Sequence, residues 1–290
     1  MGDPTEVIES EGCFTTGDGL ALRFRQWSPR GATKARVVVV HGVAEHSGRY
    51  GHVAGLLALA GYEVVAYDQR GHGRSDGRRV FVDRFARYVE DLEIFRRLDD
   101  QPRVTRPTFL IGHSMGGAVA LAHALEHPDT WRGVVLSGPA VDPGNGVPSA
   151  LIAVGRLAAR FAPRLGVIKL DVRGVSRDPA VVAAYRADPL VHHGPLTAAF
   201  GAALMDRAAT FSEEAPSLAV PLLVIVGGAD QLVDPVGIRT LFPSFGSVDK
   251  RLSEYPGLAH EVFNEPERDV VLAELINWLD ARLLGEFLQE

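Results

Sequence analysis

Cysteine is nearly absent from this chain of 290 residues, in which Cys13 is the single example. One thiol cannot form an intrachain disulfide or a metal site built from several cysteines. We interpret Cys13 as an incidental small apolar side chain, compatible with a reducing cytoplasm. The motifs HExxH and GxGxxG are also missing, and the pair His192 and His193 is too little for a metal site. We therefore expect no metal and no cofactor.

Excess basic charge and long apolar runs are lacking as well. Lysine and arginine number 30 against 36 aspartates and glutamates, which gives a formal net charge of −6. The arginines are scattered, so we expect no nucleic-acid partner. No run approaches the roughly 18 apolar residues of a membrane span, and the first residues, MGDPTEVIESEG, lack a basic region followed by an apolar core. We expect a cytoplasmic protein that contacts a membrane, if at all, only peripherally.

Short apolar runs are what the sequence has instead. Runs of this kind are typical of strands covered on both faces, and they occur at residues 36–40, 63–67, 108–111, 133–136 and 221–226. Amphipathic helical patterns lie between them, and a hairpin is predicted near the N-terminus from residues 13–16 and 20–27. This order predicts an α/β fold with a mostly parallel central sheet flanked by helices, whose ligands bind at the carboxyl ends of the strands.

The alternation of strands and helices stops between residues 141 and 210, where no strand-like run occurs. We predict an inserted helical cap at residues 143–206, with the core formed by residues 1–142 and 207–290. Within the cap, an apolar helix at residues 149–162 carries Arg156, Arg160 and Arg164 at steps of four. This basic row suits contact with a lipid surface, and it equally suits a cap helix whose arginines are solvated.

One segment carries a specific catalytic signal. A short strand leads into Gly112-His113-Ser114-Met115-Gly116, and a helix of small residues follows. This order is typical of a nucleophile elbow, in which a serine takes a strained backbone conformation between two glycines. The hydroxyl of Ser114 is then presented at a helix N-terminus, where unpaired N–H groups favour developing negative charge.

A serine nucleophile needs a histidine base and a carboxylate that orients it. Of ten histidines, His260 is the last, and it lies between a predicted strand at residues 250–255 and the final helix. The acid is expected between Ser114 and His260, just after a strand, where Asp230 lies. Asp234 is the competitor, but it precedes Pro235 and a helical stretch, which an N-cap role explains.

The reaction also needs two N–H donors for the oxyanion. Met115, first in the helix after Ser114, supplies one, and we expect Val43, in the loop after the strand at residues 36–40, to supply the second. A polar loop at residues 68–76, DQRGHGRSD, contains two glycines and no nucleophile. We interpret that loop as structural.

Three segments together carry a family resemblance: HGVAEHSGRY at residues 41–50, DQRGHGRS at residues 68–75 and GHSMGG at residues 112–117. The chain resembles the monoacylglycerol lipases of the α/β-hydrolase superfamily, particularly their bacterial members. The resemblance implies an α/β-hydrolase fold and agrees with Asp230 and His260 as triad members. It also implies a serine hydrolase that cleaves monoacylglycerols to fatty acid and glycerol through an acyl-enzyme.

The resemblance further implies a pocket for the polar headgroup of the substrate, formed by Glu45, Arg49, His113 and Tyr185. Glu45 and Arg49 would alternatively form a structural ion pair. Some relatives carry a second histidine three residues after the catalytic one, where this chain has Phe263, so the headgroup geometry is expected to differ. For the acyl chain we expect an apolar tunnel under the cap, lined in part by three residues: Leu151, Ile152 and Ile168.

Several alternatives stay open at this point. A lysophospholipase or a broad carboxylesterase would carry the same triad with a different polar pocket. From another class, the fold would serve as a noncatalytic ligand receptor, which the complete set of triad residues argues against. The sequence leaves the acyl length, the selectivity among mono-, di- and triacylglycerols and the oligomeric state undetermined.

Overall fold

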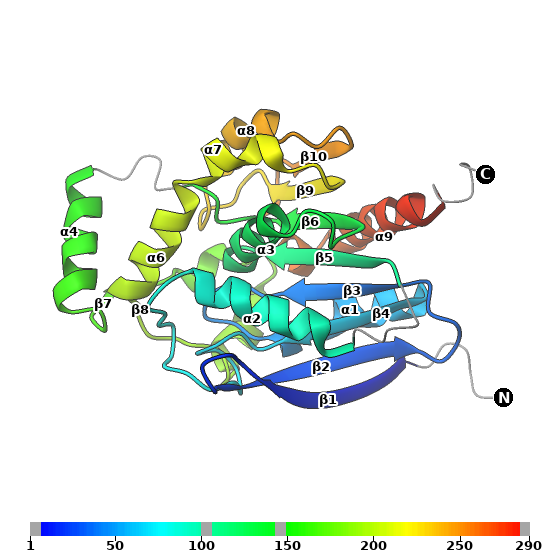
Figure 1. Ribbon diagram of the computed structural model, residues 1–290, viewed down its shortest axis with the longest axis horizontal. Helices are drawn as coiled ribbons and strands as arrows, with labels where there is room; N and C mark the ends of the chain where they lie inside the picture. Colours follow the sequence, from blue (N-terminus) through cyan, green and yellow to red (C-terminus); the bar gives the residue numbers. More distant parts are fainter. Residues whose placement is uncertain (1–6, 100–105, 143–148, 285–290) are drawn as a thin grey trace.

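The computed structural model describes residues 7–99, 106–142 and 149–284, with the backbone only for residues 99, 149–152 and 284. Its centre is an eight-stranded sheet in the order β1-β2-β4-β3-β5-β6-β9-β10 (Figure 1). The strands are β1 (Val7–Thr15), β2 (Ala21–Pro29), β3 (Ala35–Val40), β4 (Tyr62–Tyr67), β5 (Thr108–His113), β6 (Gly133–Ser137), β9 (Leu222–Gly227) and β10 (Lys250–Tyr255). The strands β1 and β2 are antiparallel to their neighbours and the rest run parallel, which confirms the predicted sheet.

The parallel strands form where short apolar runs were found because helices cover both faces of the sheet. Every residue of β4, β6 and β9 is buried. By contrast, β1 at the edge is mostly exposed, and its pairing with β2 extends over nine residues from Val7↔Pro29 to Thr15↔Ala21. The predicted hairpin is therefore correct in position but shorter than the observed one, since solvent-facing polar residues continue both strands beyond the apolar pattern.

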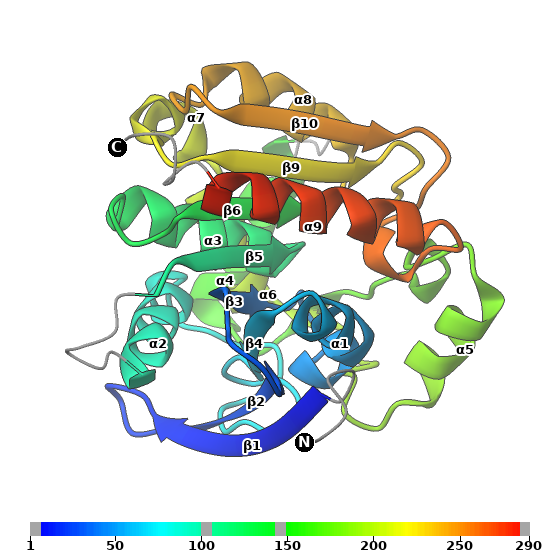
Figure 2. The same cartoon turned by 90° about the vertical axis from the view of Figure 1, so that its right-hand side faces the viewer.

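Helices pack on the two faces as separate layers. The side chains of α1 and α9 form one apolar core against the sheet, and those of α2, α3 and α8 belong to another on the opposite face (Figure 2). The α-helices of the core are α1 (Gly51–Leu59), α2 (Ala86–Arg96), α3 (Met115–Glu126), α7 (Phe211–Glu214), α8 (Pro235–Leu241) and α9 (Arg268–Leu284). Short 3-10 helices are η1 (Ser47–Tyr50), η2 (Arg97–Asp99), η4 (Ala215–Ser217), η5 (Phe242–Ser244) and η6 (Val262–Asn264).

The chain between β6 and β9 leaves the sheet, as expected for an inserted cap. It contains α4 (Ser149–Phe161), β7 (Gly166–Ile168), η3 (Val172–Gly174), α5 (Pro179–Ala187), β8 (Leu196–Thr197) and α6 (Ala198–Ala208). The expectation that this region holds no strand is wrong, because β7 and β8 pair antiparallel; they are too short to produce an apolar run. The proposed cap limits of 143 and 206 stay a prediction, since residues 143–148 lie outside the described residues and α6 continues to Ala208.

The connection from β5 to α3 has the geometry of an elbow. Ser114 lies there with φ 54° and ψ −120°, a left-handed φ that non-glycine residues seldom adopt. A Cβ on Gly112 would lie 2.3 Å from the carbonyl oxygen of Gly116, and a Cβ on Gly116 would lie 2.1 Å from that of Val40. Glycine at these two positions therefore permits the start of α3 to pack directly against β3 and β5, and Ser114 lies at the junction of β5 and α3.

We predict that Gly116→Ala lowers the free energy of unfolding by about 1–3 kcal/mol or more, because backbone atoms must move to admit the methyl group. The matched control is Gly55→Ala in α1, where an added Cβ meets no atom within 4 Å. That change should raise the free energy of unfolding by about 0.5–1 kcal/mol, through the better helix propensity of alanine. Urea unfolding of both variants measures the difference, and a neutral Gly116→Ala would contradict the packing argument.

Candidate active site

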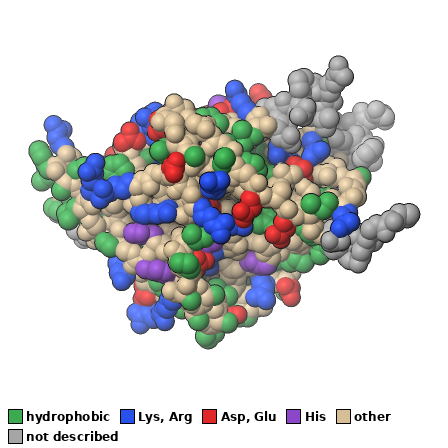
Figure 3. Space-filling view, turned by 90° about the horizontal axis from the view of Figure 1, so that it is seen from below, with side chains coloured by type: hydrophobic (Ala, Val, Ile, Leu, Met, Phe, Trp, Pro, Cys, Tyr) green, Lys and Arg blue, Asp and Glu red, His purple; other side chains and the backbone are tan. Residues whose placement is uncertain are grey.

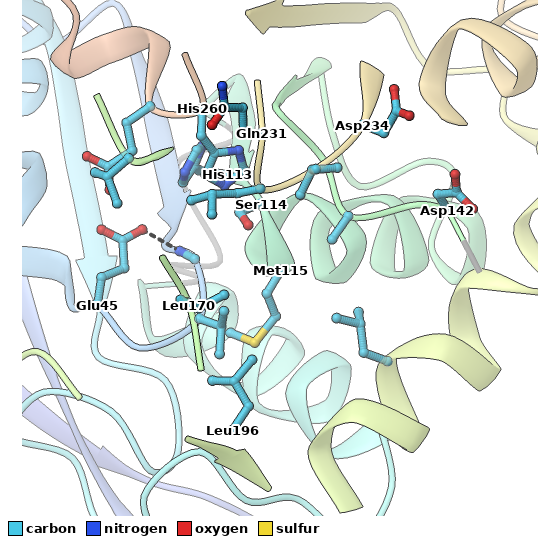
Figure 4. Close-up of a pocket in the computed structure, with 18 of the residues that line it drawn as sticks. Glu45, His113, Ser114, Met115, Asp142, Leu170, Leu196, Gln231, Asp234 and His260 are labelled. Carbon is cyan, nitrogen blue, oxygen red and sulfur yellow. Dashed lines mark hydrogen bonds between the residues drawn. The ribbon is translucent and has the colours of Figure 1, made fainter. Parts of the chain in front are cut away.

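Three separate loops bring Ser114, Asp230 and His260 to one edge of the sheet. Ser114 follows β5, Asp230 lies three residues after the end of β9, and His260 lies five residues after the end of β10. The carboxyl ends of parallel neighbouring strands meet at the same edge, so residues far apart in sequence converge there. Figure 4 shows His260 and Ser114 beside His113 in a pocket at this edge.

His260 and Asp230 form a buried hydrogen-bonded pair. The Nδ1 atom of His260 lies 2.6 Å from Oδ2 of Asp230, and the side chains are 6% and 1% exposed. The other oxygen of Asp230 accepts hydrogen bonds from the backbone N–H groups of Leu232 and Val233, at 2.8 and 3.0 Å. Because the carboxylate accepts from Nδ1, the proton of a neutral His260 is assigned to that atom, which leaves the lone pair of Nε2 to act as a base.

Asp234 has a different role. Its Oδ1 accepts a hydrogen bond of 2.9 Å from the N–H of Val236, and Pro235 occupies the first turn of α8. Asp234 is exposed, whereas Asp230 is buried against His260. The expected N-cap role of Asp234 is thus what the structure shows.

Ser114, Val43 and Met115 line the same pocket as His260. In the described part of the chain, no hydrogen bond engages Ser114 Oγ or the N–H of Val43. The N–H of Met115, at the first position of α3, has no acceptor within the helix. These three groups therefore stay available to a substrate, and hydrogen bonds between a nucleophile and its base commonly shorten in the substrate complex.

A cluster of charges borders the pocket beside the loop that carries Val43. Arg49 forms an ion pair with Glu45, N–O 2.6 Å, and donates two further hydrogen bonds, of 2.5 and 2.6 Å, to Glu261. Glu45 also accepts hydrogen bonds from the N–H of Gly42 at 2.6 Å and from the hydroxyl of Tyr50 at 2.9 Å. The structural ion pair considered for Glu45 and Arg49 is therefore present. Of these two residues, Glu45 lines the pocket and Arg49 does not.

Glu261 is a residue that the sequence reasoning missed. It lines the pocket and takes both nitrogens of the Arg49 fork, and the side-chain amide of Asn264 donates a third hydrogen bond to it at 2.8 Å. The available signal was its place directly after His260, since a neighbour of a base in a tight loop enters the same site. Its partner lies 212 positions away in sequence, which no local pattern indicates.

Burial and charge shift the ionisation of this region. Burial is the largest effect on Glu45 and would raise its pKa, but Arg49, the nearby imidazoles and the N–H of Gly42 together outweigh burial and hold that pKa below the ordinary value. For Glu261 the burial effect prevails over Arg49, and the pKa is raised. Burial, assisted by His260, lowers the pKa of His113 to about 3, so its imidazole is neutral near pH 7. His113 Nδ1 lies 3.1 Å from Ser137 Oγ.

The pocket is a cavity of about 420 Å³ with a polar end and an apolar end. The polar end contains Glu45, His113, Tyr185 and Glu261. The apolar end includes Met115 of α3. It also includes four residues from the segment between β6 and β9: Leu170, Leu196, Phe200 and Leu204.

The apolar lining differs from the one we expected. Ile168 is 58% exposed on β7, whose three residues are all exposed, and it is absent from the pocket lining, so its expected place in an acyl tunnel is wrong. Leu170, two residues later, lines the pocket instead. The side chains of Leu151 and Ile152 lie outside the described residues, and their role stays a prediction.

The polar loop at residues 68–76 is held by internal hydrogen bonds and by hydrogen bonds to neighbouring segments. Asp68 accepts hydrogen bonds from the N–H and Oγ of Ser47, at 2.9 and 2.6 Å, and from the N–H of Arg74 at 2.8 Å. Arg70 donates two hydrogen bonds to the buried Asp91, at 2.6 and 2.7 Å. The loop contributes no residue to the pocket lining in the described part of the chain, as its structural interpretation predicts.

One other cluster has the residue types of a metal site. Potential ligand atoms of Glu93, His123 and His127 lie within 4.8 Å of one another. However, Trp131 Nε1 donates to Nδ1 of His123, so the proton of that neutral ring lies on Nε2 and points at Glu93, 2.9 Å away. Glu93 is also paired with Arg96 and Arg97. The cluster is therefore already satisfied by protons and arginines, which disfavours a cation.

Comparisons with known proteins agree with this geometry. Residues 31–267 match the family described as serine aminopeptidase, S33. The monoacylglycerol lipase of Mycolicibacterium smegmatis is 42% identical over 274 residues, which cover 94% of this chain and 98% of that protein. The crystal structure of the Paleococcus ferrophilus monoacylglycerol lipase superposes with a TM-score of 0.79 at 32% identity, covering 96% and 99% of the two chains.

A second solved structure extends the comparison. It is a soluble variant of the Saccharomyces cerevisiae monoglyceride lipase in complex with a substrate analogue. It superposes with a TM-score of 0.85 at 26% identity, and the match covers 97% of each chain. The elbow, the hydrogen-bonded acid and base, the sheet order and these matches over nearly the whole length lead to one assignment. The chain belongs to the monoacylglycerol lipase family of serine hydrolases, which have the α/β-hydrolase fold.

Proposed function

We propose that this protein hydrolyses monoacylglycerols to fatty acid and glycerol, with Ser114, His260 and Asp230 as the catalytic triad. The observation that carries the proposal is the buried His260–Asp230 pair in the same pocket as a serine with φ 54°. The pocket joins this pair to an apolar compartment, which suits an ester with one acyl chain. The substrate named for the relatives of this chain supports the same choice.

The proposed reaction is acyl transfer through a covalent ester. Nε2 of His260 removes the proton of Ser114 Oγ as the oxygen attacks the ester carbonyl carbon, and Asp230 stabilises the imidazolium. The N–H groups of Val43 and Met115 donate to the oxyanion of the tetrahedral intermediate. The intermediate collapses when the imidazolium gives its proton to the glycerol oxygen. Water then attacks the acyl-serine by the same route and releases the fatty acid.

The polar end of the pocket binds the glycerol headgroup of the substrate, and the apolar end binds its acyl chain. The hydroxyl of Tyr185 has no hydrogen-bond partner among the described residues and lies in a side chain that is only 5% exposed. With Glu45 and His113 it offers donors and acceptors to the hydroxyls of glycerol, while Arg49 acts through the carboxylate it orients. The acyl chain extends along the apolar end, mainly beside Phe200 and Leu204.

The triad predicts unequal effects of two aspartate changes. We expect Ser114→Ala to abolish hydrolysis of monooleoylglycerol, and Asp230→Asn to lower kcat by roughly 10³- to 10⁴-fold through loss of the orienting carboxylate. Asp234→Asn, the control four residues away, should keep kcat within about twofold, because this exposed carboxylate lines the pocket but caps α8 and makes no hydrogen bond to His260 in the described part of the chain.

Titration of released fatty acid measures these rates, and thermal melting checks the fold. Labelling by a fluorophosphonate probe should disappear in Ser114→Ala. Equal losses in the two asparagine variants would refute the assignment of the acid. A wild-type protein that resists the probe and every ester would instead favour a noncatalytic receptor.

The cap presents an apolar surface to solvent at one end of the molecule (Figure 3, left). The cap face is formed by Val154, Leu157, Phe161, Leu165 and Ile168, each at least 53% exposed. Arg160 and Arg164 are exposed beside it, and Arg156 pairs with Asp206 at 2.7 Å. Within the described residues, no helix has the length and apolar character needed to traverse a bilayer. We propose that the cap face instead rests on a lipid surface as a peripheral contact.

This contact predicts a dependence on anionic lipid. Joint replacement of Arg156, Arg160 and Arg164 by glutamine should weaken binding to vesicles rich in phosphatidylglycerol by roughly 100-fold, because each charge lost near the surface is worth about 1 kcal/mol. Sedimentation with sucrose-loaded vesicles measures the binding constant.

The control replaces three exposed arginines outside the cap by glutamine: Arg74, Arg239 and Arg251. It removes the same total charge and should leave vesicle binding within about twofold of the wild type. Equal weakening in the two triple variants would show that only the overall charge matters, and unchanged binding in the first would remove the cap face as a contact.

A further inference from the structure

The pocket carries more acidic than basic groups. Four carboxylate side chains line it, and no lysine or arginine does so among the described residues. Glu45 lies on one side of Ser114, and Asp142 and Asp234 lie on the other (Figure 4). Glu261 belongs with Glu45 at the polar end, because Arg49 bridges the two carboxylates. Apart from the Tyr185 phenol, the other titratable side chains that the described residues contribute to the lining are the imidazoles of His113 and His260.

The cation beside this end of the pocket, Arg49, is already paired with two carboxylates. Glu261 takes one hydrogen bond from each terminal nitrogen of its guanidinium, and Glu45 takes a second from Nη1. The ring of Tyr185 covers the guanidinium at 4.6 Å from its centre. The side chain of Arg49 is 11% exposed and does not line the pocket, so its guanidinium is not presented to a ligand there. Two carboxylates against one guanidinium give this cluster an excess of negative charge.

Such a cluster accepts one kind of headgroup and rejects another. A carboxylate only accepts hydrogen bonds, and a hydroxyl can donate to it without bringing charge. An ionised phosphate offers acceptors alone and adds a like charge, which is costly where little water screens the groups. Had Arg49 faced the pocket, its fork would have matched a phosphate in two hydrogen bonds. Glu261 therefore binds the Arg49 guanidinium, which would otherwise have been able to bind a phosphate.

We propose that Glu261 is a specificity-determining residue: by binding both nitrogens of Arg49, it makes the pocket select uncharged hydroxyl headgroups against monoacyl lipids that carry a phosphate. This inference rests on the proposed function, because it concerns which monoacyl esters reach Ser114. Glu261 acts on the headgroup and takes no part in the proton transfers of His260.

The experiment compares two substrates with the same acyl chain, 1-oleoylglycerol and 1-oleoyl-lysophosphatidate, in micelles of one uncharged detergent. For the wild type we expect kcat/KM to favour the glycerol ester by at least roughly 100-fold, from like-charge repulsion in a buried site. Glu261→Gln should narrow that ratio by roughly 10-fold or more, through faster turnover of lysophosphatidate, because one negative charge is removed and the Arg49 fork is partly freed.

Two further variants separate charge from shape. Glu261→Asp keeps the charge, so it should keep the wild-type ratio even where its kcat is lower. Glu267→Gln removes a carboxylate that is 47% exposed on the same chain segment and outside the pocket, and it should change neither rate. Thermal melting shows whether each variant is folded.

Three results would overturn the inference: a wild-type ratio near one, parallel loss of both activities in Glu261→Gln, or equal narrowing of the ratio in Glu261→Asp and Glu261→Gln. The wild-type ratio tests it even where a variant does not fold. Failure of the proposed function would look different, since the wild type would then be inert toward both lipids, inert toward p-nitrophenyl butyrate and unlabelled by a fluorophosphonate.

Discussion

The close approach of α3 to the sheet is the constraint on which the site depends. The backbone of Gly116 packs so near the carbonyl oxygen of Val40 that no side chain fits between them. This contact fixes the start of α3 directly above the ends of β3 and β5, and it holds Ser114 in its left-handed conformation. The serine hydroxyl, the helix N-terminus and the loop that carries Val43 consequently meet at one point.

The remaining parts of the site are held by hydrogen bonds that serve two purposes. Asp230 accepts from two backbone N–H groups of its own loop, so the carboxylate that orients His260 is itself fixed. Glu45 accepts from the N–H of Gly42, beside Val43, and at the same time borders the headgroup end of the pocket. Removal of either carboxylate would therefore disturb a loop as well as a charge.

The features that could be predicted from the sequence are those determined by residues close together in the chain. The strands, the elbow at Ser114 and the choice of Asp230 over Asp234 follow from residues within a few positions of each other, where turn and cap rules apply. The bond between Arg49 and Glu261 depends on how two distant loops meet, and Ile168 was misplaced because the exposed face of β7 is set by how the cap packs. Strands as short as β7 and β8 leave no periodicity to recognise.

The cap and the core are joined at the headgroup end, and this junction links recognition to chemistry. Tyr185 of α5 covers the guanidinium of Arg49, His46 Nε2 lies 2.8 Å from Asp188 Oδ2, and the N–H of His192 donates to the carbonyl oxygen of Ala44 at 2.8 Å. Ala44 has φ 68° and follows Val43 directly, so the loop that carries Val43 is held in a strained turn by contacts from the cap. A displacement of the cap segment at residues 185–192 would break these contacts together. The cap segment proposed to select the substrate therefore also holds the loop of Val43, whose N–H is one of the two proposed oxyanion donors.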